Sequence, residues 1–405
     1  MDNVTHAFIG AAMAECAVGR GAPTRTRTVF IAAGIIAANA PDVDLLYTGL
    51  TEAPLGYLLH HRGHSHTLPG LAVLGLLIWS GLRFLPWTRS AVAGMERRSI
   101  VLIAAALLGH LLMDTANSYG THLFYPFSRR WVHGDAVFVL EPWLWVILGA
   151  GLALNARRYW RALPALLAFA PLAALGALGL LQARVLTAMF VVAAVIGVAT
   201  RAWERQRRAV LILAVATTIF VLMPAVSRVA KAEAQRGALA VTPGEIVDIV
   251  ADSNPGVPWC WSVLTVQKAD RVNGGSAEAL VARKGTLSLL PGVWPAESCA
   301  SAAVMSRHWG PPETSGGILW HRRWRIDVDE LRALYAANCR VRAWLQFGRV
   351  PYVGNGSIAD LRFEHPIGQN FTPMAVDSND RGCPAFVTGW ELPRHDLLTD
   401  SSDSR

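Results

Sequence analysis

The sequence predicts a membrane-embedded bundle of α-helices followed by a soluble α+β domain with an antiparallel sheet. Three observations support this fold class. The chain of 405 residues is 53% hydrophobic and only 16% charged, whereas an average soluble domain is about 25% charged. The apolar residues are concentrated before residue 226, in runs rich in Ala, Leu, Val, Ile and Gly. The remainder has mixed polarity, with short β-rich segments bounded by Pro and Gly.

This change in composition divides the chain into three parts. We expect a membrane-embedded domain over residues 1–226, a linker or polar helix over 227–242 and a soluble domain over 243–405. No cleavable signal peptide is expected, because Asp2 and His6 stand where a basic segment would be needed.

The first part contains about eight apolar runs that are candidate membrane spans. A full span needs about 20 residues, and several runs are shorter, so the first two are candidates for partial or re-entrant segments. The eight runs cover residues 4–18, 28–40, 68–85, 99–113, 137–154, 162–182, 185–199 and 209–226.

Basic loops between these runs predict an orientation. With eight crossings the Arg-containing loops all fall on one side, which the positive-inside rule makes cytoplasmic. The loops 41–67 and 114–136 and the soluble domain then lie on the outer side. We expect a multi-pass protein of a bacterial inner (plasma) membrane. The basic loops cover residues 19–27, 83–98, 155–161 and 200–208.

The cysteines are consistent with this orientation. Cys16 lies in the first apolar run, whereas Cys260, Cys299, Cys339 and Cys383 belong to the soluble domain. Four cysteines in an extracytoplasmic domain predict two disulfides, for which three pairings are open. A zinc site built from all four thiolates is the alternative, although the chain has no C-x-x-C pair.

The net charge of +8 does not indicate a nucleic-acid partner. The arginines cluster in short loops between apolar runs, as in membrane proteins, and no nucleic-acid-binding motif accompanies them.

Histidines and aspartates in the first 141 residues predict a metal site. Four histidines stand within residues 60–66, and eight of the twelve in the chain precede residue 134. Imidazole and carboxylate groups are common zinc ligands. Each of these residues alone could be a solvated histidine or a helix cap, so the prediction rests on their grouping. The predicted ligands are His6, Asp42, Asp44, His61, His66, His110 and Asp114.

Helical spacing places some of these residues on common faces. His110 and Asp114 are four residues apart at the end of an apolar run, and Asp2 and His6 have the same spacing at the start of another. We expect one to three zinc ions, with manganese or iron as alternatives.

Three further residues are candidates for catalysis. Arg62 could hold phosphate oxygens, since a guanidinium group matches them bidentately. Asp135 or Glu141 could assist proton transfer. Arg129 and Arg130 could bind phosphate or contact lipid headgroups.

Short motifs recur around these residues over about residues 1–145. They are Met1-Asp2 with Thr5-His6 and Gly10, Asn39 with Pro41-Asp42 and Asp44, His61-Arg62-Gly63 with Ser65-His66, Gly109-His110 with Asp114, and Asn117 with Tyr119-Gly120-Thr121. Together they resemble the YdjM/YbcI-type membrane-bound metal-dependent hydrolases, and the resemblance implies a metal-dependent hydrolase in a membrane. One departure is Glu141-Pro142, where the family pattern has Asp-Pro.

The ligand order is also similar to that of zinc-dependent phospholipase C and the single-strand nucleases. That similarity implies a set of zinc ligands that includes His6, Asp42 or Asp44, His66, His110 and Asp114.

The soluble domain carries no recognisable catalytic motif. It has neither a nucleophile triad nor a Gly-rich phosphate loop. The segment 320–324, Trp-His-Arg-Arg-Trp, could cover the metal site or bind an anionic partner, or could consist of core tryptophans on a solvated basic strand.

The function favoured by these observations is a membrane-bound metal-dependent hydrolase. The expected substrate is a phosphoester of a lipid or a lipid-linked molecule at the outer face of the membrane, and membrane lipids are the expected partners. The alternatives are a structural or regulatory membrane protein with a stabilising metal, and a metal or solute transporter. Acidic residues deep inside several spans would favour a transporter, but the candidate ligands stand near the ends of the apolar runs.

Overall fold

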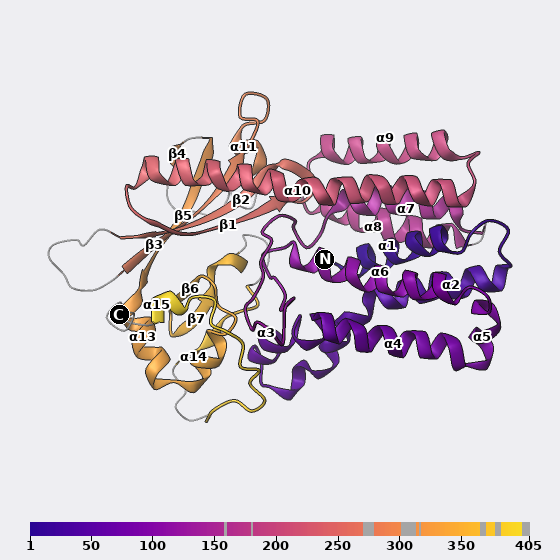
Figure 1. Ribbon diagram of the computed structural model, residues 1–405. Helices are drawn as coiled ribbons and strands as arrows, with labels where there is room; N and C mark the ends of the chain where they lie inside the picture. Colours follow the sequence, from indigo (N-terminus) through magenta and orange to yellow (C-terminus); the bar gives the residue numbers. More distant parts are fainter. Residues whose placement is uncertain are drawn as a thin grey trace.

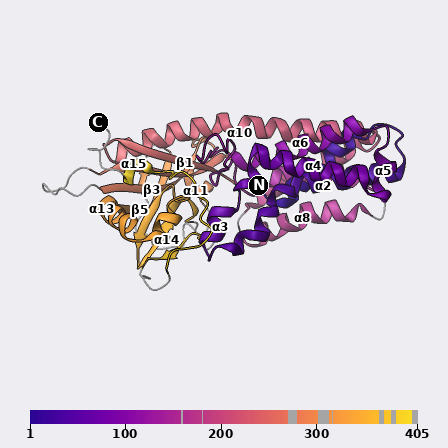
Figure 2. The same cartoon turned by 60° about the horizontal axis from the view of Figure 1, so that its bottom comes forward.

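A helical part and an α+β part lie side by side in this computed structural model, and one long helix runs along both (Figures 1 and 2). The structure describes residues 1–157, 160–179, 181–269, 279–300, 313–315, 317–364, 370–376 and 382–398.

The helical part begins with short and medium helices and ends with the long helix α10. Its elements are α1 (Asn3–Ala17), α2 (Thr24–Asn39), the 3₁₀ segment η1 (Ala40–Leu50), α3 (Leu55–His60), η2 (His64–His66), α4 (Leu68–Phe84), α5 (Pro86–Val92), α6 (Glu96–Thr115), α7 (Pro142–Asn155), α8 (Ala162–Ala177), α9 (Ala183–Thr200) and α10 (Arg205–Val241).

Helices α1 and α2 approach each other closely where two glycines face each other. A Cβ atom on Gly10 would lie 2.2 Å from the carbonyl oxygen of Gly34, and one on Gly34 would lie 2.3 Å from that of Gly10. No other residue fits at either position without moving a helix. The contact brings the start of α1, with His6, beside the end of α2, where the segment η1 begins.

The prediction of about eight membrane spans is not supported. In the described part of the chain, four helical segments are long and apolar enough to cross a membrane: Thr24–Leu50, Glu96–Thr115, Ala183–Thr200 and Arg205–Val241. A fifth follows if Leu55–His66 and Leu68–Phe84, bent by 68°, form one broken span.

Burial explains part of the overcount. Helix α7 is apolar on all sides, but 11 of its 14 residues are buried inside the protein. A helix that is apolar all round belongs either to a core or to a membrane, and its sequence alone does not separate the two. Helices α7 and α8 are also shorter than 18 residues. In α9 and α10, by contrast, only 17% and 22% of the apolar window is buried, as in helices that face lipid.

The α+β part is built on an antiparallel sheet of five strands in the order β1-β2-β3-β5-β4. A second antiparallel sheet has the order β6-β7-β8. The elements are β1 (Ile246–Asn254), β2 (Val257–Lys268), β3 (Ala279–Ser288), α11 (Ala296–Cys299), β4 (Glu313–Ser315), β5 (Ile318–Asp327), α13 (Val328–Ala337), α14 (Cys339–Trp344), β6 (Pro351–Gly354), β7 (Ser357–Asp360), η5 (Leu361–Phe363), β8 (Met374–Ala375) and α15 (His395–Leu398). An α+β domain with an antiparallel sheet, as predicted, follows the helices.

The two parts share their hydrophobic cores. One buried cluster joins Phe8 and Trp145 of the helices to Trp261 of the sheet. Another joins Leu58 and Tyr119 to tryptophan and phenylalanine residues of the C-terminal segment. Because apolar burial stabilises by roughly 25 cal/mol per Å², this shared core fixes the α+β part against the ends of the helices.

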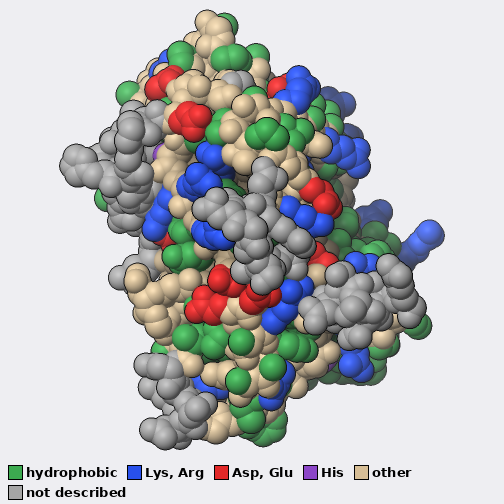
Figure 3. All heavy atoms as spheres, turned by 90° about the vertical axis from the view of Figure 1, so that its left-hand side faces the viewer, with side chains coloured by type: hydrophobic (Ala, Val, Ile, Leu, Met, Phe, Trp, Pro, Cys, Tyr) green, Lys and Arg blue, Asp and Glu red, His purple; other side chains and the backbone are tan. Residues whose placement is uncertain are grey.

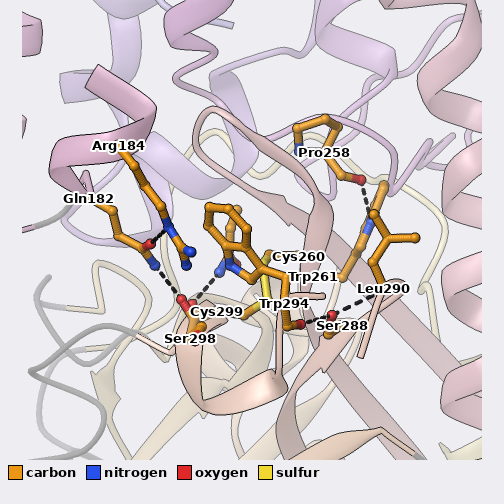
Figure 4. Close-up of a disulfide and its surroundings, with 11 residues drawn as sticks. Gln182, Arg184, Pro258, Cys260, Trp261, Ser288, Leu290, Trp294, Ser298 and Cys299 are labelled. Carbon is orange, nitrogen blue, oxygen red and sulfur yellow. Dashed lines mark hydrogen bonds between the residues drawn. A yellow bond between two sulfur atoms is a disulfide. The ribbon is translucent and has the colours of Figure 1, made fainter. Parts of the chain in front are cut away.

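A disulfide lies beside one of these junctions. Cys260 of β2 is bonded to Cys299 of α11. At the start of α9, the side-chain amide of Gln182 donates a hydrogen bond to the carbonyl oxygen of Ser298, and the Arg184 guanidinium lies over the Trp294 ring (Figure 4). The second disulfide joins Cys339 and Cys383.

The far end of the α+β part has a mixed surface. Acidic and basic side chains lie next to one another there, with hydrophobic side chains between them (Figure 3). Interspersed charge of both signs is typical of a surface in contact with water, in contrast to the exposed apolar side chains of α4, α6, α9 and α10.

Thiol labelling tests both disulfides and the compartment of the α+β part. Protein taken directly from cells and denatured without reductant should accept one label, at Cys16, and five after reduction. Cys16→Ser should abolish the first signal, and peptide mapping should recover the two pairs named above. Five labels without reductant would place the domain in a reducing compartment and contradict the expected orientation.

Candidate metal centre

Four segments bring the predicted ligands together where the helical part meets the α+β part. Six of the seven side chains are buried and Asp42 is half-buried. Helix α1 supplies His6, η1 supplies Asp42 and Asp44, the α3–η2 segment supplies His61 and His66, and α6 supplies His110 and Asp114.

Four of these residues form a compact group. Asp42, His66, His110 and Asp114 each offer one donor atom, and these atoms all lie within 4.8 Å of one another. The Nε2 atoms of the two histidines are 3.0 Å apart. His66 Nε2 is 3.5 Å from Asp42 Oδ1 and 3.4 Å from Asp114 Oδ2. His110 Nε2 is 3.7 Å and 3.5 Å from the same two atoms.

These distances fit a tetrahedral metal ion. Ligand atoms at zinc–nitrogen and zinc–oxygen distances of about 2.0–2.1 Å lie about 3.3 Å from one another in a tetrahedron. Two imidazole nitrogens and two carboxylate oxygens are a donor set that zinc, manganese and iron accept. The cluster is therefore able to hold a metal ion.

A second contact fixes the orientation of His110. Its Nδ1 atom lies 2.7 Å from the carbonyl oxygen of Ala38 at the end of α2. A carbonyl only accepts hydrogen bonds, so Nδ1 carries the proton and Nε2 of the neutral ring keeps its lone pair for a metal. Such supporting contacts are the rule for histidine ligands.

Asp44 supports two histidines at once. Its carboxylate lies 3.0 Å from His61 Nδ1 and 2.9 Å from His66 Nδ1. It also accepts hydrogen bonds of 2.8 Å from the backbone N–H of Arg62 and from the Ser65 hydroxyl. With Asp42 and His61 it also forms a second group of potential ligands.

Arg62 connects this segment to the end of α6. Its backbone has φ of +59°, a left-handed conformation that is uncommon for a residue with a side chain. Its Nη1 donates to the carbonyl oxygen of Asp114 at 3.2 Å and to Asn117 Oδ1 at 2.8 Å, and its Nε is 3.1 Å from Asp114 Oδ2. The left-handed turn thus places the guanidinium group beside the cluster.

His6 lies at the edge of the cluster. Its Nε2 is 3.2 Å from Asp114 Oδ1, and its ring stacks on that of His110 with 3.9 Å between centroids. Its Nδ1 is buried and has no hydrogen-bond partner among the described residues. The Met1 ammonium group also contacts Asp114.

The structure places Asp135 and Glu141 apart from these ligands. Asp135 forms ion pairs with Lys231 of α10 at 2.6 Å and with Arg349 at 3.0 Å, and Arg349 also pairs with Asp248 of β1. Glu141 caps α7 by accepting from the backbone N–H of Trp143. Neither residue lines the cavity beside the metal cluster.

That cavity has a volume of about 590 Å³ and walls from both parts of the chain. The helical part contributes Asp42, His61 and Arg62. The α+β part contributes Asp252 of β1, Lys284 of β3 and Arg362 of η5, none of which was predicted from the sequence. Lys284 follows Arg283 in a strand, a pattern that indicates a solvent-facing surface until the tertiary structure is known.

Replacing the metal ligands should weaken metal binding more than replacing a residue that orients them. The double variant His110→Ala with Asp114→Ala should lose the metal of the purified protein, as measured by elemental analysis. Asp44→Asn should weaken binding about 10–100-fold, the range for groups that orient metal ligands. His395→Ala, a change of an exposed histidine on α15, is the control. Unchanged metal content in the double variant would exclude this cluster as the site.

The buried Glu141 should lower the free energy of unfolding of the protein at neutral pH. Burial raises its pKa from 4.5 to about 7, so unfolding releases a proton between these values and stability falls as the pH rises through this range. Above pH 7 the cost is about 3 kcal/mol. Glu141→Gln should therefore raise the melting temperature at pH 8 and leave it nearly unchanged at pH 4. A lower melting temperature at pH 8 would contradict this account.

The comparisons with known proteins match part of the chain. An uncharacterized protein of Bacillus subtilis (strain 168), YfhP, is 25% identical over 158 residues. This alignment covers 38% of the present chain and 46% of YfhP, so the chain matches less than half of that relative. The search of solved structures gave no significant match.

The sequence model of one family matches residues 1–186. This region contains every predicted metal ligand, together with Arg62, Asp135 and Glu141. The match confirms the resemblance seen in the motifs: residues 1–186 are similar to the YdjM inner membrane protein family.

Proposed function

We propose that the protein is an integral membrane metal-dependent hydrolase, namely a zinc phosphoesterase that acts on a lipid or lipid-linked substrate at the outer face of the inner membrane. The observation that carries this proposal is the buried cluster of Asp42, His66, His110 and Asp114 beside a cavity of about 590 Å³. Candidate metal ligands, a group that can accept a proton and cationic side chains all lie at this one place.

Zinc is the metal that we propose, from a donor set that manganese and iron also accept. Structural zinc sites use four protein ligands and catalytic sites keep one position open for water or substrate. Asp42 is the least buried of the four ligands, with 9% of its side chain exposed, and it lines the cavity, so water or substrate would approach a bound ion from the cavity side. A zinc ion held by these residues would supply a Lewis acid and would lower the pKa of bound water towards about 7.

The side chains around the cavity suit phosphoester hydrolysis. Arg62 lines the cavity, where its Nε contacts Asp114 and its Nη1 donates to Asn117. A guanidinium group in this place suits phosphate oxygens, which it can bind bidentately. His61 also lines the cavity. Because His61 Nδ1 contacts Asp44, its Nε2 is the atom left to accept a proton from water or to bind a second ion.

The position of the cluster favours a lipid substrate. Asp42 lies near the end of the candidate span Thr24–Leu50, and Asp114 near the end of the candidate span Glu96–Thr115. Met113, beside Asp114, lines an apolar groove of about 480 Å³ between α6 and α10. An acyl chain in such a groove would place its headgroup near the cavity.

An outer-face location is supported by two features. The α+β part contains two disulfides, which are typical of oxidising compartments. The start of α10 carries Arg205, Arg207 and Arg208, and basic residues at that end favour the cytoplasmic side.

A hydrolysis screen tests the proposal. Purified protein should release phosphate or a phosphorylated headgroup from at least one member of a panel of phospholipids and polyprenyl phosphates. A chelator should abolish the activity, zinc should restore it, and His110→Ala with Asp114→Ala should lower it by at least 100-fold while His395→Ala leaves it unchanged. Metal binding without hydrolysis of any panel member would favour the structural or regulatory alternative.

A further inference from the structure

Residues of the α+β part form one wall of the cavity. Asp252, Ser262 and Lys284 come from three neighbouring strands, β1, β2 and β3. Asp252 pairs with Ser262, and Lys284 pairs with Leu264 on the same strand as Ser262. All three polar residues line the same cavity as Asp42 and Arg62. The sheet therefore turns a polar face towards the metal cluster.

Lys284 is a buried cation without a carboxylate partner in the described part of the chain. Its side chain is 5% exposed. Its Nζ donates to two carbonyl oxygens, those of Arg362, at 3.4 Å, and Glu364. An ammonium group has three donors, so one remains. A buried charge of this kind is costly unless an opposite charge or further hydrogen bonds compensate it.

The side chain of Lys284 stays protonated at neutral pH. Burial lowers the pKa of Lys284 to about 8, and the Asp252 and Glu364 carboxylates act in the opposite direction. At pH 7 the charged form is therefore the major one.

The other cations of the cavity differ in this respect. Arg362 is paired with Asp360, and its Nη1 donates to the carbonyl oxygen of Ser118 at 2.6 Å. Its donors serve to hold the segment that follows α6. Lys284 has two acceptors for its three N–H donors among the described residues, whereas the Arg62 Nε and the Met1 ammonium group both contact Asp114.

A second unpaired donor lies in the same cavity. Asn117 is 1% exposed, and its Oδ1 accepts from Arg62 while its Nδ2 has no partner among the described residues. The next residue, Ser118, donates to Asp252 at 3.1 Å. An amide N–H group, a guanidinium group and an ammonium group thus line one cavity, and all three are donors that suit an oxyanion.

We propose that Lys284 binds the anionic group of the substrate, a phosphate-type oxyanion, so that the α+β part completes the substrate site of the metal centre. That the bound anion belongs to a substrate rests on the proposed function, whereas the presence of an anion site does not. Lys284 lies outside residues 1–186, the region that the family model matches. The site on this chain would therefore depend on a domain beyond that region.

Binding of anions to metal-free protein tests this inference apart from catalysis. Full-length protein in detergent, stripped with a chelator, would be titrated by calorimetry with inorganic phosphate, with dihexanoyl phosphatidic acid and with dihexanoylglycerol. Wild-type protein should bind at least one of the two phosphate compounds and bind the neutral lipid more weakly. Binding of free phosphate alone or of the lipid phosphate alone would identify which source of the oxyanion the site accepts.

The variants then locate the site. Lys284→Met, which keeps the length of the side chain, should weaken anion binding about 10–100-fold, as expected for loss of a charge-assisted hydrogen bond. Lys284→Arg should retain most of the affinity. Lys268→Met, at an exposed lysine that pairs with Glu245 at the end of β2, should bind like wild type. Melting temperatures would show that each variant is folded.

Two results would overturn the inference. One is equal anion affinity in folded Lys284→Met and wild type, and the other is no binding of either phosphate compound by wild type. Lysine-dependent anion binding together with failure of every hydrolysis assay would contradict the proposed function and leave the anion site standing.

Discussion

The structure depends on the hydrogen bonds and ion pairs that offset the cost of burying carboxylates at the junction of its two parts. Asp44 and Asp114 are almost fully buried, and an isolated carboxylate in such a place would be strongly destabilising. Asp44 is compensated by two histidine rings, a hydroxyl group and a backbone N–H. Asp114 is surrounded by His6, His66, His110 and Arg62. These groups come from α1, α6 and the segment between α2 and α4, so the carboxylates hold the ends of the helices together.

The same kind of polar contact links the candidate metal ligands to the α+β part. Arg62 binds Asn117, and the neighbouring Ser118 is held by Asp252 of β1 and Arg362 of η5. A change in the sheet can therefore reach the ligands through one short segment.

The ligand region could be predicted from the sequence because its spacing and composition patterns each involve few residues. The spacing of His110 and Asp114 fixes one helix face, and the density of histidines at 60–66 indicates a site without any tertiary information. The role of Asp44 beside two histidine Nδ1 atoms could not be foreseen, because it requires the folded path of η1. The same holds for Lys284, whose neighbours in the cavity lie far away in the sequence. The predicted number of spans is not supported, because apolar helices such as α7 and α8 are shorter than a membrane span.

Helix α10 determines how far the sheet can stand from a membrane. Its 37 residues make it about 55 Å long at 1.5 Å per residue, whereas the apolar layer of a bilayer is about 30 Å thick. An α10 that crosses the membrane would therefore extend well beyond it, and β1 and β2 pack against this helix. A continuous helix acts as a spacer of set length. The height of the polar sheet face above the acyl chains would then be set by a count of residues.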